Sequence, residues 1–531
     1  MTKIILDLIL FYLFYLFFFI SSSGYGKILT SFLSIQSKNI NYFELNLFGN
    51  IFYLIIGYGL YLTSSFNSTF NTVLALFGIG VYFFYKKHLN IIPLKKIIFY
   101  LSLFFSALLI SKLHEDFLTY HFSGLQEIFL NKLTVGSGNI SLRFVHVSLF
   151  SYIQALYIFP FLEYKLINIP VFHIFISTIG YFFLNFKKLN TSKIEKFFCF
   201  FILTFLIIKF TRLNEYGYDY IAQFLLLIIF HKLFFLKKKR CEIFKSIVLF
   251  IFSISIKKIS LLFSPLFLLL FWSKNIFELI KSSFQKKYLF LIFLLLMIIF
   301  SNSFIRSGCI FYPINYTCLS KAQIDWGVKE ELKKHSVEIE SWAKGFYHQK
   351  ISKYKNIKNQ KKYLSNWHWF KVWIDIHFFY KVFEFLLIII SLYFAMYFII
   401  SKNKKIISFK TKELLSILAL SLTSIFFWLD TVPQFRFGFA SIIIFSFFLL
   451  VLICQKDFEL KKRGALVLII ISIIFFNLKN FNRINSELSR NDLYQYNNFP
   501  WFNDDVTQKN YKNDKFIIKD KKFYRIVRGI N

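Results

Sequence analysis

The sequence predicts an all-α polytopic membrane protein with roughly 11–13 transmembrane helices, and three observations predict this class. Of the 531 residues, 56% are hydrophobic and 77 are Phe. Apolar runs recur from Ile4 to Leu478, and many reach the roughly 17–25 residues that a helix needs to cross the hydrocarbon core. Lysines and arginines lie mainly between these runs. An ordinary soluble domain is far less apolar, so the composition disfavours a soluble fold.

The net charge is strongly positive, because 64 Lys and Arg stand against 28 Asp and Glu, a balance of +36. In a soluble protein this balance points to nucleic acid. Here the basic residues flank apolar runs, which is typical of topogenic charges and of contacts with anionic lipid head groups. Membrane lipids are therefore expected partners, and nucleic acid is not.

The chain start and the cysteines narrow the class further. Met1 to Ile20 lacks an A-x-A-like cleavage site after its apolar stretch, which favours a retained first helix over a cleaved signal peptide. Gly24 and Gly26 are then expected to interrupt a helix, so the number of spans in the first 85 residues stays open. The five cysteines form no C-x-x-C pair, and no metal site is predicted.

The basic loops give the chain one orientation downstream of Lys86, because cytoplasmic loops carry the excess of Lys and Arg. The segments expected in the cytoplasm are 86–96, 187–196, 237–240, 274–287, 402–410 and 456–463. The outer segments are then 112–170, 211–220, 306–377 and 430–437. A transmembrane core of residues 1–478 is thus followed by an outer polar tail, 479–531. Lys257, Lys258 and the charged tail depart from the rule.

The helices between these loops follow in order. A partly apolar stretch, 147–162, is interpreted as a helix in the membrane interface, because a span there puts Lys187 and Lys188 outside. Segment 306–377 is predicted to form a small, partly helical module between two spans. The spans expected from residue 97 onward are 97–111, 170–186, 197–210, 221–235, two short helices that turn at Lys257 and Lys258, 288–304, 378–400, 413–429, 438–454 and 465–476.

The first outer loop carries the candidate catalytic residues. It reads K-L-H-E-D-F-L-T-Y-H and places Glu115 and Asp116 at the mouth of a helix. Partial desolvation raises the pKa of a carboxyl group towards the working pH, so either residue can serve as a general base. A solvated acidic loop end is the alternative. The candidate substrate-binding residues nearby are His114, Tyr120, His121 and Arg143.

A second charged segment, T-R-L-N-E-Y-G-Y-D-Y, contains Arg212, Glu215 and Asp219, three and four residues apart. On one helix these side chains share a face and pair with one another. Gly217 indicates a break instead, after which Asp219 begins the next helix and faces inward. All three are candidates for substrate binding.

Isolated cations occur at two outer turns. Lys257 and Lys258 lie where the topology gives no reason for positive charge, and Arg436 lies in W-L-D-T-V-P-Q-F-R-F-G beside a helix start. Such cations suit an anionic ligand such as a lipid-linked phosphate. Snorkelling towards lipid head groups is the alternative for the lysines.

The large outer loop opens with R-S-G-C-I-F-Y-P-I-N-Y-T-C. Cys309 and Cys318 lie nine residues apart on a side where disulfides persist, so we expect them to form a bridge. Arg306 before them and Asp325 after them are further candidates for substrate binding.

These features together resemble the GT-C superfamily of integral membrane glycosyltransferases. The shared features are an acidic first outer loop after an early span, a following interfacial helix, some dozen spans and a late outer domain. The H-E-D-F-L-T-Y-H segment carries most of the likeness. The segments R-L-N-E-Y-G-Y-D, S-G-C-I-F-Y-P and P-Q-F-R-F-G also look like an uncharacterised bacterial family of multi-spanning proteins.

The resemblance implies a reaction class and a side of the membrane. The expected donor is a polyprenyl-phosphate sugar, and the acceptor is a glycan or lipid of the cell envelope. Asp116 is the first choice for the base and Glu115 the second, while Lys258, Arg436 and Arg212 hold the donor phosphate. A divalent metal is compatible with this chemistry but has no support in the sequence. The expected location is the bacterial cytoplasmic (inner) membrane, with the functional loops on the periplasmic side.

Two other classes stay open. A transporter or flippase for a lipid-linked or anionic solute can use the same cations, although we find no internal repeat of the kind that many transporters contain. An envelope polysaccharide polymerase or ligase depends on outer-loop arginines and histidines instead of the pair Glu115 and Asp116.

Overall fold

The computed structural model describes residues 2–36, 39–85, 94–110, 121–189, 191–213, 218–236, 240–272, 285–349, 357–365, 367–406, 411–454, 456–489, 499–501, 516–519 and 522–525. Helices dominate these residues, which confirms the multi-spanning α-helical class. Eight described helical segments are long and apolar enough to cross a membrane: Thr2–Phe32, Tyr42–Thr63, Ser68–Tyr85, Tyr164–Lys187, Lys286–Ser307, His368–Ile399, Lys412–Thr431 and Lys462–Ser486. Lys258–Leu270 and Phe439–Ile453 are shorter apolar segments. The larger count of 11–13 spans stays a prediction.

The first 85 residues form three long helices, α1 (Thr2–Phe32), α2 (Tyr42–Thr63) and α3 (Ser68–Tyr85). The expectation that Gly24 and Gly26 interrupt a helix is wrong, because α1 runs through both. Their role is close packing: a Cβ atom on Gly24 would lie 1.9 Å from a backbone oxygen of α3, and one on Gly26 1.8 Å from a backbone oxygen of α2. Small residues let helix backbones approach in this way within membranes.

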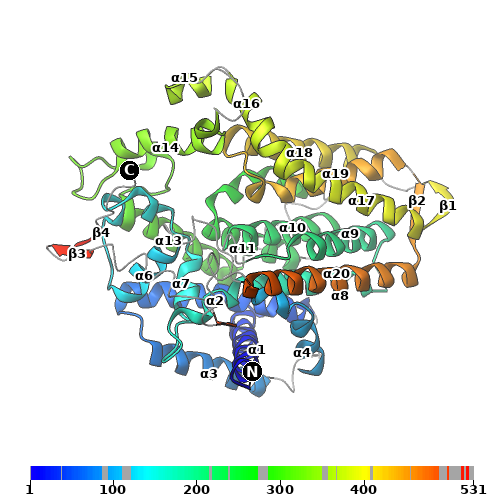
Figure 1. Ribbon diagram of the computed structural model, residues 1–531, viewed down its shortest axis with the longest axis horizontal. Coiled ribbons are helices and arrows are strands. Elements are labelled where there is room, and N and C mark those ends of the chain that lie inside the picture. Colours follow the sequence, from blue (N-terminus) through cyan, green and yellow to red (C-terminus); the bar gives the residue numbers. More distant parts are fainter. Residues whose placement is uncertain are drawn as a thin grey trace.

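The centre of the molecule is a layer of helices along its long axis (Figure 1). The layer contains α8 (Ile169–Lys187), α9 (Lys193–Lys209), α10 (Asp219–Phe235) and α20 (Lys462–Ser489). Nearly every side chain of α10 is buried, as expected for a helix that is apolar all round and enclosed by others. α11 (Arg240–Ile256) packs against α10, and the 3-10 helix η8 (Lys258–Trp272) follows it.

Two short helices, α4 (Leu94–Leu103) and α5 (Phe105–Leu108), overlap the span expected over 97–111. The described part of the first outer segment consists of short helices: α6 (Phe122–Leu130), η4 (Ser137–Asn139), η5 (Leu142–His146), α7 (Phe150–Ala155) and η6 (Tyr164–Leu166). The sequence predicted a helix at the membrane interface over 147–162. The helix found there, α7, is only six residues long and buried on all sides. Two of its polar side chains bond within the protein, since Tyr152 Oη donates to Asn302 Oδ1 and Gln154 Nε2 donates to the carbonyl of Ile167.

α13 (Lys286–Ser307) leads into the large loop, where Cys309 and Cys318 form a disulfide. The loop continues through η9 (Asn315–Thr317), α14 (Lys329–Ala343), η10 (Phe346–His348), α15 (Gln360–Ser365), α16 (His368–Trp373) and the π-helix η11 (Ile374–Val382). A small core of its own joins this loop to the first outer segment, because Tyr312 and Leu332 pack against Val145. The two predicted outer loops therefore meet in space.

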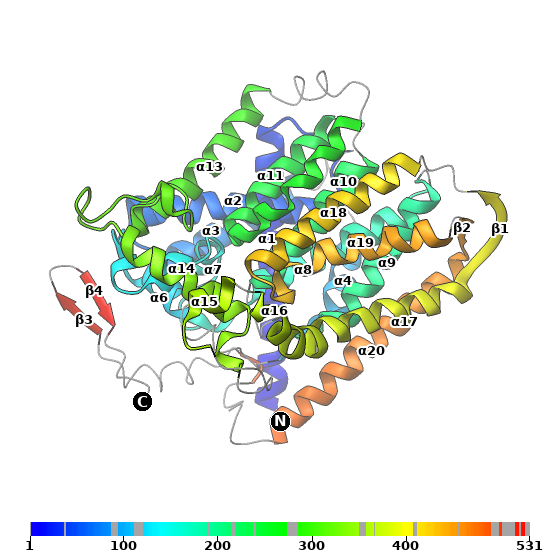
Figure 2. The ribbon, with the colours of Figure 1, turned by 90° about the horizontal axis from the view of Figure 1, so that it is seen from above.

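The remaining helices are α17 (Phe383–Ile399), α18 (Thr411–Thr431), η12 (Phe435–Phe437) and α19 (Phe439–Cys454). Two antiparallel strand pairs complete the described chain: β1 (Ile400–Ile406) with β2 (Lys456–Leu460), and β3 (Phe516–Lys519) with β4 (Lys522–Arg525). α14 and the β1–β2 pair lie towards opposite ends of the long axis (Figures 1 and 2).

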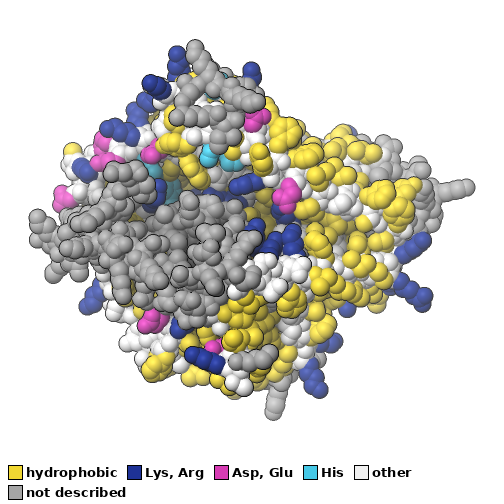
Figure 3. All heavy atoms as spheres, in the orientation of Figure 1, with side chains coloured by type: hydrophobic (Ala, Val, Ile, Leu, Met, Phe, Trp, Pro, Cys, Tyr) yellow, Lys and Arg dark blue, Asp and Glu magenta, His cyan; other side chains and the backbone are white. Residues whose placement is uncertain are grey.

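Apolar side chains cover much of the right-hand half of the visible face, and Lys and Arg gather at its right-hand edge (Figure 3). This distribution suits a protein surrounded by lipid between two polar ends.

The close contact of α1 and α2 yields a stability prediction. A Cβ atom on Gly49 would lie 1.7 Å from the carbonyl oxygen of Ser22, whereas one on Gly59 of the same helix meets open space. Gly49→Ala is expected to lower the free energy of unfolding by about 1–3 kcal/mol through overpacking. Gly59→Ala is the matched control and should not destabilise the protein. Thermal unfolding of the detergent-purified variants, followed by Trp fluorescence, measures the difference; equal midpoints contradict the close packing.

Candidate functional site

A buried carboxylate lies at the start of α10. Asp219 is 0% exposed, and its side chain meets two cations from distant parts of the chain. Lys257 Nζ lies 2.5 Å from Asp219 Oδ1, and Arg436 Nε lies 3.3 Å from Asp219 Oδ2. Burying an isolated ionised carboxylate costs much free energy. Asp219 can therefore stay charged in this buried position only because these two cations lie beside it.

A histidine and a tyrosine complete this group. His121 Nδ1 shares a hydrogen bond with Tyr218 Oη, and His121 Nε2 lies 3.9 Å from Asp219 Oδ1. The Tyr218 hydroxyl also accepts a hydrogen bond of 3.4 Å from the backbone N–H of Ser148. The ammonium of Lys257 lies 5.1 Å from the centre of the Tyr218 ring, a distance typical of a cation–π contact. We call Asp219, Lys257, Arg436, His121 and Tyr218 the Asp219 cluster.

Local sequence explains why these residues meet. Asp219 is the first residue of α10, where the helix dipole favours a negative charge. Lys257 lies in the turn between α11 and η8, and Arg436 lies in η12 between Pro433 and Gly438. His121 directly precedes α6. Each charged group thus sits at an element end, where the chain changes direction, and the ends gather around Asp219.

The charge balance of the cluster is positive. Two full cations, Lys257 and Arg436, surround one carboxylate. An anion placed here gains charge-assisted hydrogen bonds from groups that the protein already holds in position. The cluster is therefore suited to a phosphate or another small anion.

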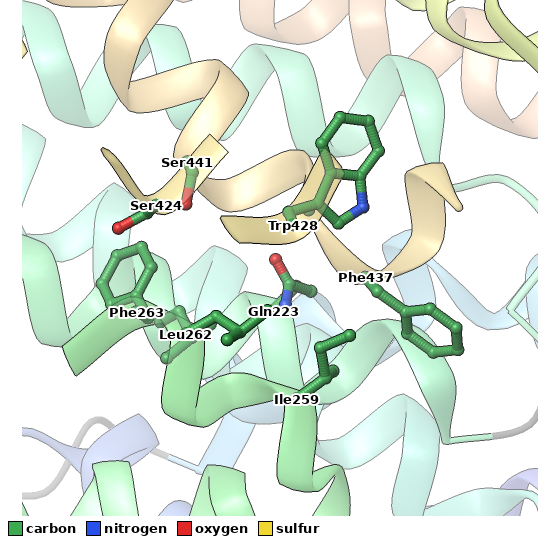
Figure 4. Close-up of a pocket in the computed structure, with 10 residues that line it drawn as sticks. Gln223, Ile259, Leu262, Phe263, Ser424, Trp428, Phe437 and Ser441 are labelled. Atoms are coloured by element: carbon green, nitrogen blue, oxygen red, sulfur yellow. The ribbon is translucent and has the colours of Figure 1, made fainter. Parts of the chain in front are cut away.

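A pocket lies next to the cluster, between α10, η8, α18 and α19 (Figure 4). It encloses about 10 Å³ of space open to water, room for a single water molecule. Phe437 lines it and also lies 5.6 Å, centroid to ammonium, from Lys257. Ser424 and Ser441 lie on one side of the pocket, with Gln223, Trp428 and Phe437 around it. The remaining lining residues are Leu226, Ile259, Leu262, Phe263 and Gly438. The lining is mixed, because the polar side chains of Gln223, Ser424 and Ser441 stand among apolar ones.

Arg306 is fully buried nearby and is saturated by protein groups. Its guanidinium lies 2.8 Å from Glu127 Oε2, and it donates to Asn302, Ser137, the carbonyl of Phe144 and Tyr152. A guanidinium has five N–H donors, and these five partners occupy them. Arg306 therefore ties α13 to α6, α7 and the intervening loop, and the geometry favours a structural role over substrate binding.

Lys258 has different surroundings from Lys257. Its ammonium lies 4.9 Å from the ring centre of Tyr312 and 5.8 Å from that of Phe311. Tyr312 Oη in turn lies 2.5 Å from His146 Nε2. The disulfide-closed hairpin of the large loop is thus part of the same region as the Asp219 cluster.

A second buried charge group lies at the other end of α10. Lys232 contacts Glu44 and lies 2.5 Å from Glu242, while Lys245 Nζ lies 2.5 Å from Glu242 and 3.2 Å from Glu44. Lys245 also donates to the carbonyl of Asn39, and Glu44 accepts from the backbone N–H of Asn41. We call Glu44, Lys232, Glu242 and Lys245 the quartet. The charges of the quartet cancel, and all its carboxylate oxygens have partners. The quartet therefore links α2, α10 and α11.

The structure brings together four residues that the sequence singled out: His121, Asp219, Lys257 and Arg436. Lys258 lies beside them. Arg143 and Asp325 are exposed, and Arg212 lies just after α9. The candidate residues His114, Glu115, Asp116, Tyr120 and Glu215 lie outside the described residues.

Sequence reasoning missed Tyr218, Tyr312, His146 and the quartet. The chain contains 31 Tyr, so residue type alone gave no signal for the tyrosines. The quartet had one usable signal, which is that Lys245 interrupts the apolar run of α11. An ionisable residue within a membrane-spanning stretch indicates a specific partner.

Comparison with known proteins gives one match. A family model described as "Domain of unknown function (DUF8201)" matches residues 8–443, which is most of the chain and includes every residue of the Asp219 cluster. No curated protein and no solved structure matches the chain.

The pairing of Asp219 yields a second prediction. Lys257→Met removes the closer cation from a buried carboxylate, so it is expected to lower the free energy of unfolding by about 3–5 kcal/mol. Asp219→Asn in addition to Lys257→Met should recover part of this loss, because the unpaired charge is gone. Chemical unfolding of the single and double variants measures the coupling.

The matched control is Lys209→Met. Lys209 pairs with Glu384 at 3.1 Å, but Glu384 is 60% exposed, so this change should cost about 1 kcal/mol or less. Equal effects of Lys257→Met and Lys209→Met contradict the importance assigned to Asp219.

Proposed function

The chain belongs to the DUF8201 family, and we propose that it is a membrane glycosyltransferase that moves a sugar from a polyprenyl-phosphate donor to an acceptor of the cell envelope. The donor phosphate binds at the Asp219 cluster, on the outer side of the bacterial inner membrane. The acceptor approaches from the outer loops. This assignment builds on the resemblance of the sequence motifs to GT-C enzymes.

One observation carries the proposal: cations from separate segments converge on a region where the described residues include fewer carboxylates than cations. Lys257 and Arg436 flank Asp219, and Lys258 lies in the adjacent position. In glycosyl transfer from a lipid phosphate, negative charge develops on the leaving phosphate. Prepositioned cations stabilise that charge more in the transition state than in the ground state.

The lipid part of the donor is proposed to lie along the apolar side chains of η8 beside Phe437. Phe437 lies 5.6 Å, centroid to ammonium, from Lys257, and Leu262 and Phe263 lie on η8. An isoprenoid chain there and a phosphate at Lys257 then occupy neighbouring positions. Membrane lipids and the lipid-linked donor are thus the proposed partners, with an envelope glycan or lipid as acceptor.

The proposed base is Asp116, with Glu115 as the second choice. Segment 111–120, which carries both, is joined to the described chain at His121, a member of the Asp219 cluster. The carboxylate takes the proton of an acceptor hydroxyl, and the hydroxyl oxygen forms a bond to the anomeric carbon. The bond from that carbon to the phosphate oxygen breaks, and the phosphate leaves with both electrons towards Lys257 and Arg436. Attack from the opposite side inverts the configuration.

The third prediction tests this assignment. Asp116→Asn removes the proposed base and is expected to reduce transfer by about 10²–10⁴-fold, the usual range for general base catalysis. Transfer is measured with the purified chain in membranes and a panel of radiolabelled polyprenyl-phosphate sugars. Glu163→Gln, which changes an exposed carboxylate of the same predicted outer segment, is the matched control and should retain activity. Full transfer by Asp116→Asn excludes this residue as the base.

A transporter or flippase is the second candidate, and the two charge groups of α10 favour it. The Asp219 cluster and the quartet place ionisable side chains at both ends of one buried helix. Buried charges in membrane proteins frequently mark a path for ions or substrates. Movement of a labelled prenyl phosphate across proteoliposomes, without any sugar transfer, favours this candidate over the transferase.

A further inference from the structure

Among the described residues, Lys258 has no acidic partner, unlike the neighbouring cations. Within the part of the chain that the structure describes, its recorded contacts are the rings of Tyr312 and Phe311. Lys257, one residue earlier, is 2.5 Å from a carboxylate. Among the described residues, an anion at Lys258 therefore meets no competing carboxylate, and Tyr312, hydrogen-bonded to His146, lies beside it. Burial and the charge of Arg306 lower the pKa of the Lys258 ammonium to about 7, so Lys258 carries its charge at pH 6.

The wall is held by several elements. The disulfide between Cys309 and Cys318 closes the hairpin that carries Tyr312, and Tyr312 is almost fully buried. Its hydroxyl lies 2.5 Å from His146 Nε2, in η5. The first outer segment and the large loop thus meet at a titratable group next to Lys258.

Titratable and charged groups reach His146 from every neighbouring element. Arg143 lies on η5 itself, Lys257 and Lys258 come from the turn before η8, and Tyr312 comes from the hairpin. From α14, the His335 ring lies 5.8 Å away, centroid to centroid, and His335 Nδ1 lies 3.3 Å from Glu338. Among the described groups around His146, the positively charged side chains outnumber the one carboxylate, Glu338.

Burial, together with the charges of His335, Lys258, Lys257 and Arg143, holds the pKa of His146 well below its ordinary value. His146 is therefore neutral at pH 7 in the empty protein. A negative charge at Lys258 opposes those cations and favours the protonated ring. The pKa of His146 must then rise when an anion binds.

We propose that His146 takes up a proton when an anionic ligand binds at Lys258, so that binding at this subsite is coupled to pH. The inference rests on the proposed function, because it deepens the description of the anion site. His146 acts here as a positioning residue: it does not contact the sugar, and it strengthens the hold on the phosphate. Between the pKa of the empty and of the occupied protein, affinity rises as the pH falls.

The fourth prediction concerns this coupling. The probe is a short prenyl phosphodiester, because its single charge does not titrate as a phosphomonoester does near pH 6. Titration calorimetry of the purified full chain at pH 6, in two buffers of different protonation enthalpy, measures the number of protons taken up. Wild type should take up close to one proton, and its affinity should increase by up to about tenfold per pH unit.

The variants separate the possible outcomes. His146→Gln should bind the probe at pH 6 with little proton uptake and should lose the rise in affinity between pH 6 and pH 5, where Lys258 is already charged. Tyr312→Phe keeps the histidine and should shift the midpoint of the pH dependence without abolishing it, which provides a second readout if His146→Gln folds poorly. His348→Gln changes a histidine of another element and is the matched control.

Proton uptake that persists in His146→Gln overturns the inference and leaves the proposed function intact, provided the probe still depends on Lys257 and Arg436. Binding without any proton uptake in wild type overturns it as well. Absence of probe binding at every pH contradicts the anion site itself, and with it both proposals.

Discussion

A carboxylate that leaves water must be compensated, and this constraint governs the outer end of the helix bundle around Asp219. Asp219 is completely buried, and the two cations that compensate it come from a turn 38 residues later and from η12, far along the chain. Removing one partner of a buried pair is much more costly than never having had the pair. The positions of α10, of the turn between α11 and η8, and of η12 therefore depend on one another.

The two ends of α10 use buried charge differently. In the quartet, two lysines and two glutamates cancel, and neighbouring backbone groups satisfy what remains. Such a network holds helices together and offers nothing to a ligand. At the Asp219 end, the described residues contain more cations than carboxylates, and a small pocket adjoins them. An anionic ligand would balance this charge, which is why we propose function at this end and structural support at the other.

Much of the fold could be predicted from hydropathy, because lipid requires long apolar helices whose backbone groups are paired internally. The sequence also singled out Lys257, Lys258 and Arg436, since they were cations where topology required none, and the Gly217 break indicated that Asp219 faces inward. Hydropathy does not show close packing. Glycine at position 24 suggests a helix break, whereas in the structure its lack of a side chain allows α3 to pack directly against α1. The short buried helix α7 depends on partners distant in sequence, such as Asn302.

The consecutive lysines show how one turn can provide two functions. Lys257 Nζ forms an ion pair with Asp219 at 2.5 Å, so an incoming anion competes with Asp219 for its ammonium. Lys258 points to aromatic rings and has no such ion pair among the described residues. An aromatic ring stabilises an ammonium by its quadrupole far less than a carboxylate does, and burial with the charge of Arg306 lowers the pKa of Lys258 to about 7, so a bound anion favours its charged form. The anion is thus expected to bind first at Lys258, with Asp219 keeping Lys257 and Arg436 fixed close by. Fixed cations need no reorganisation when charge develops on the ligand, and this is the condition for electrostatic stabilisation of a leaving phosphate.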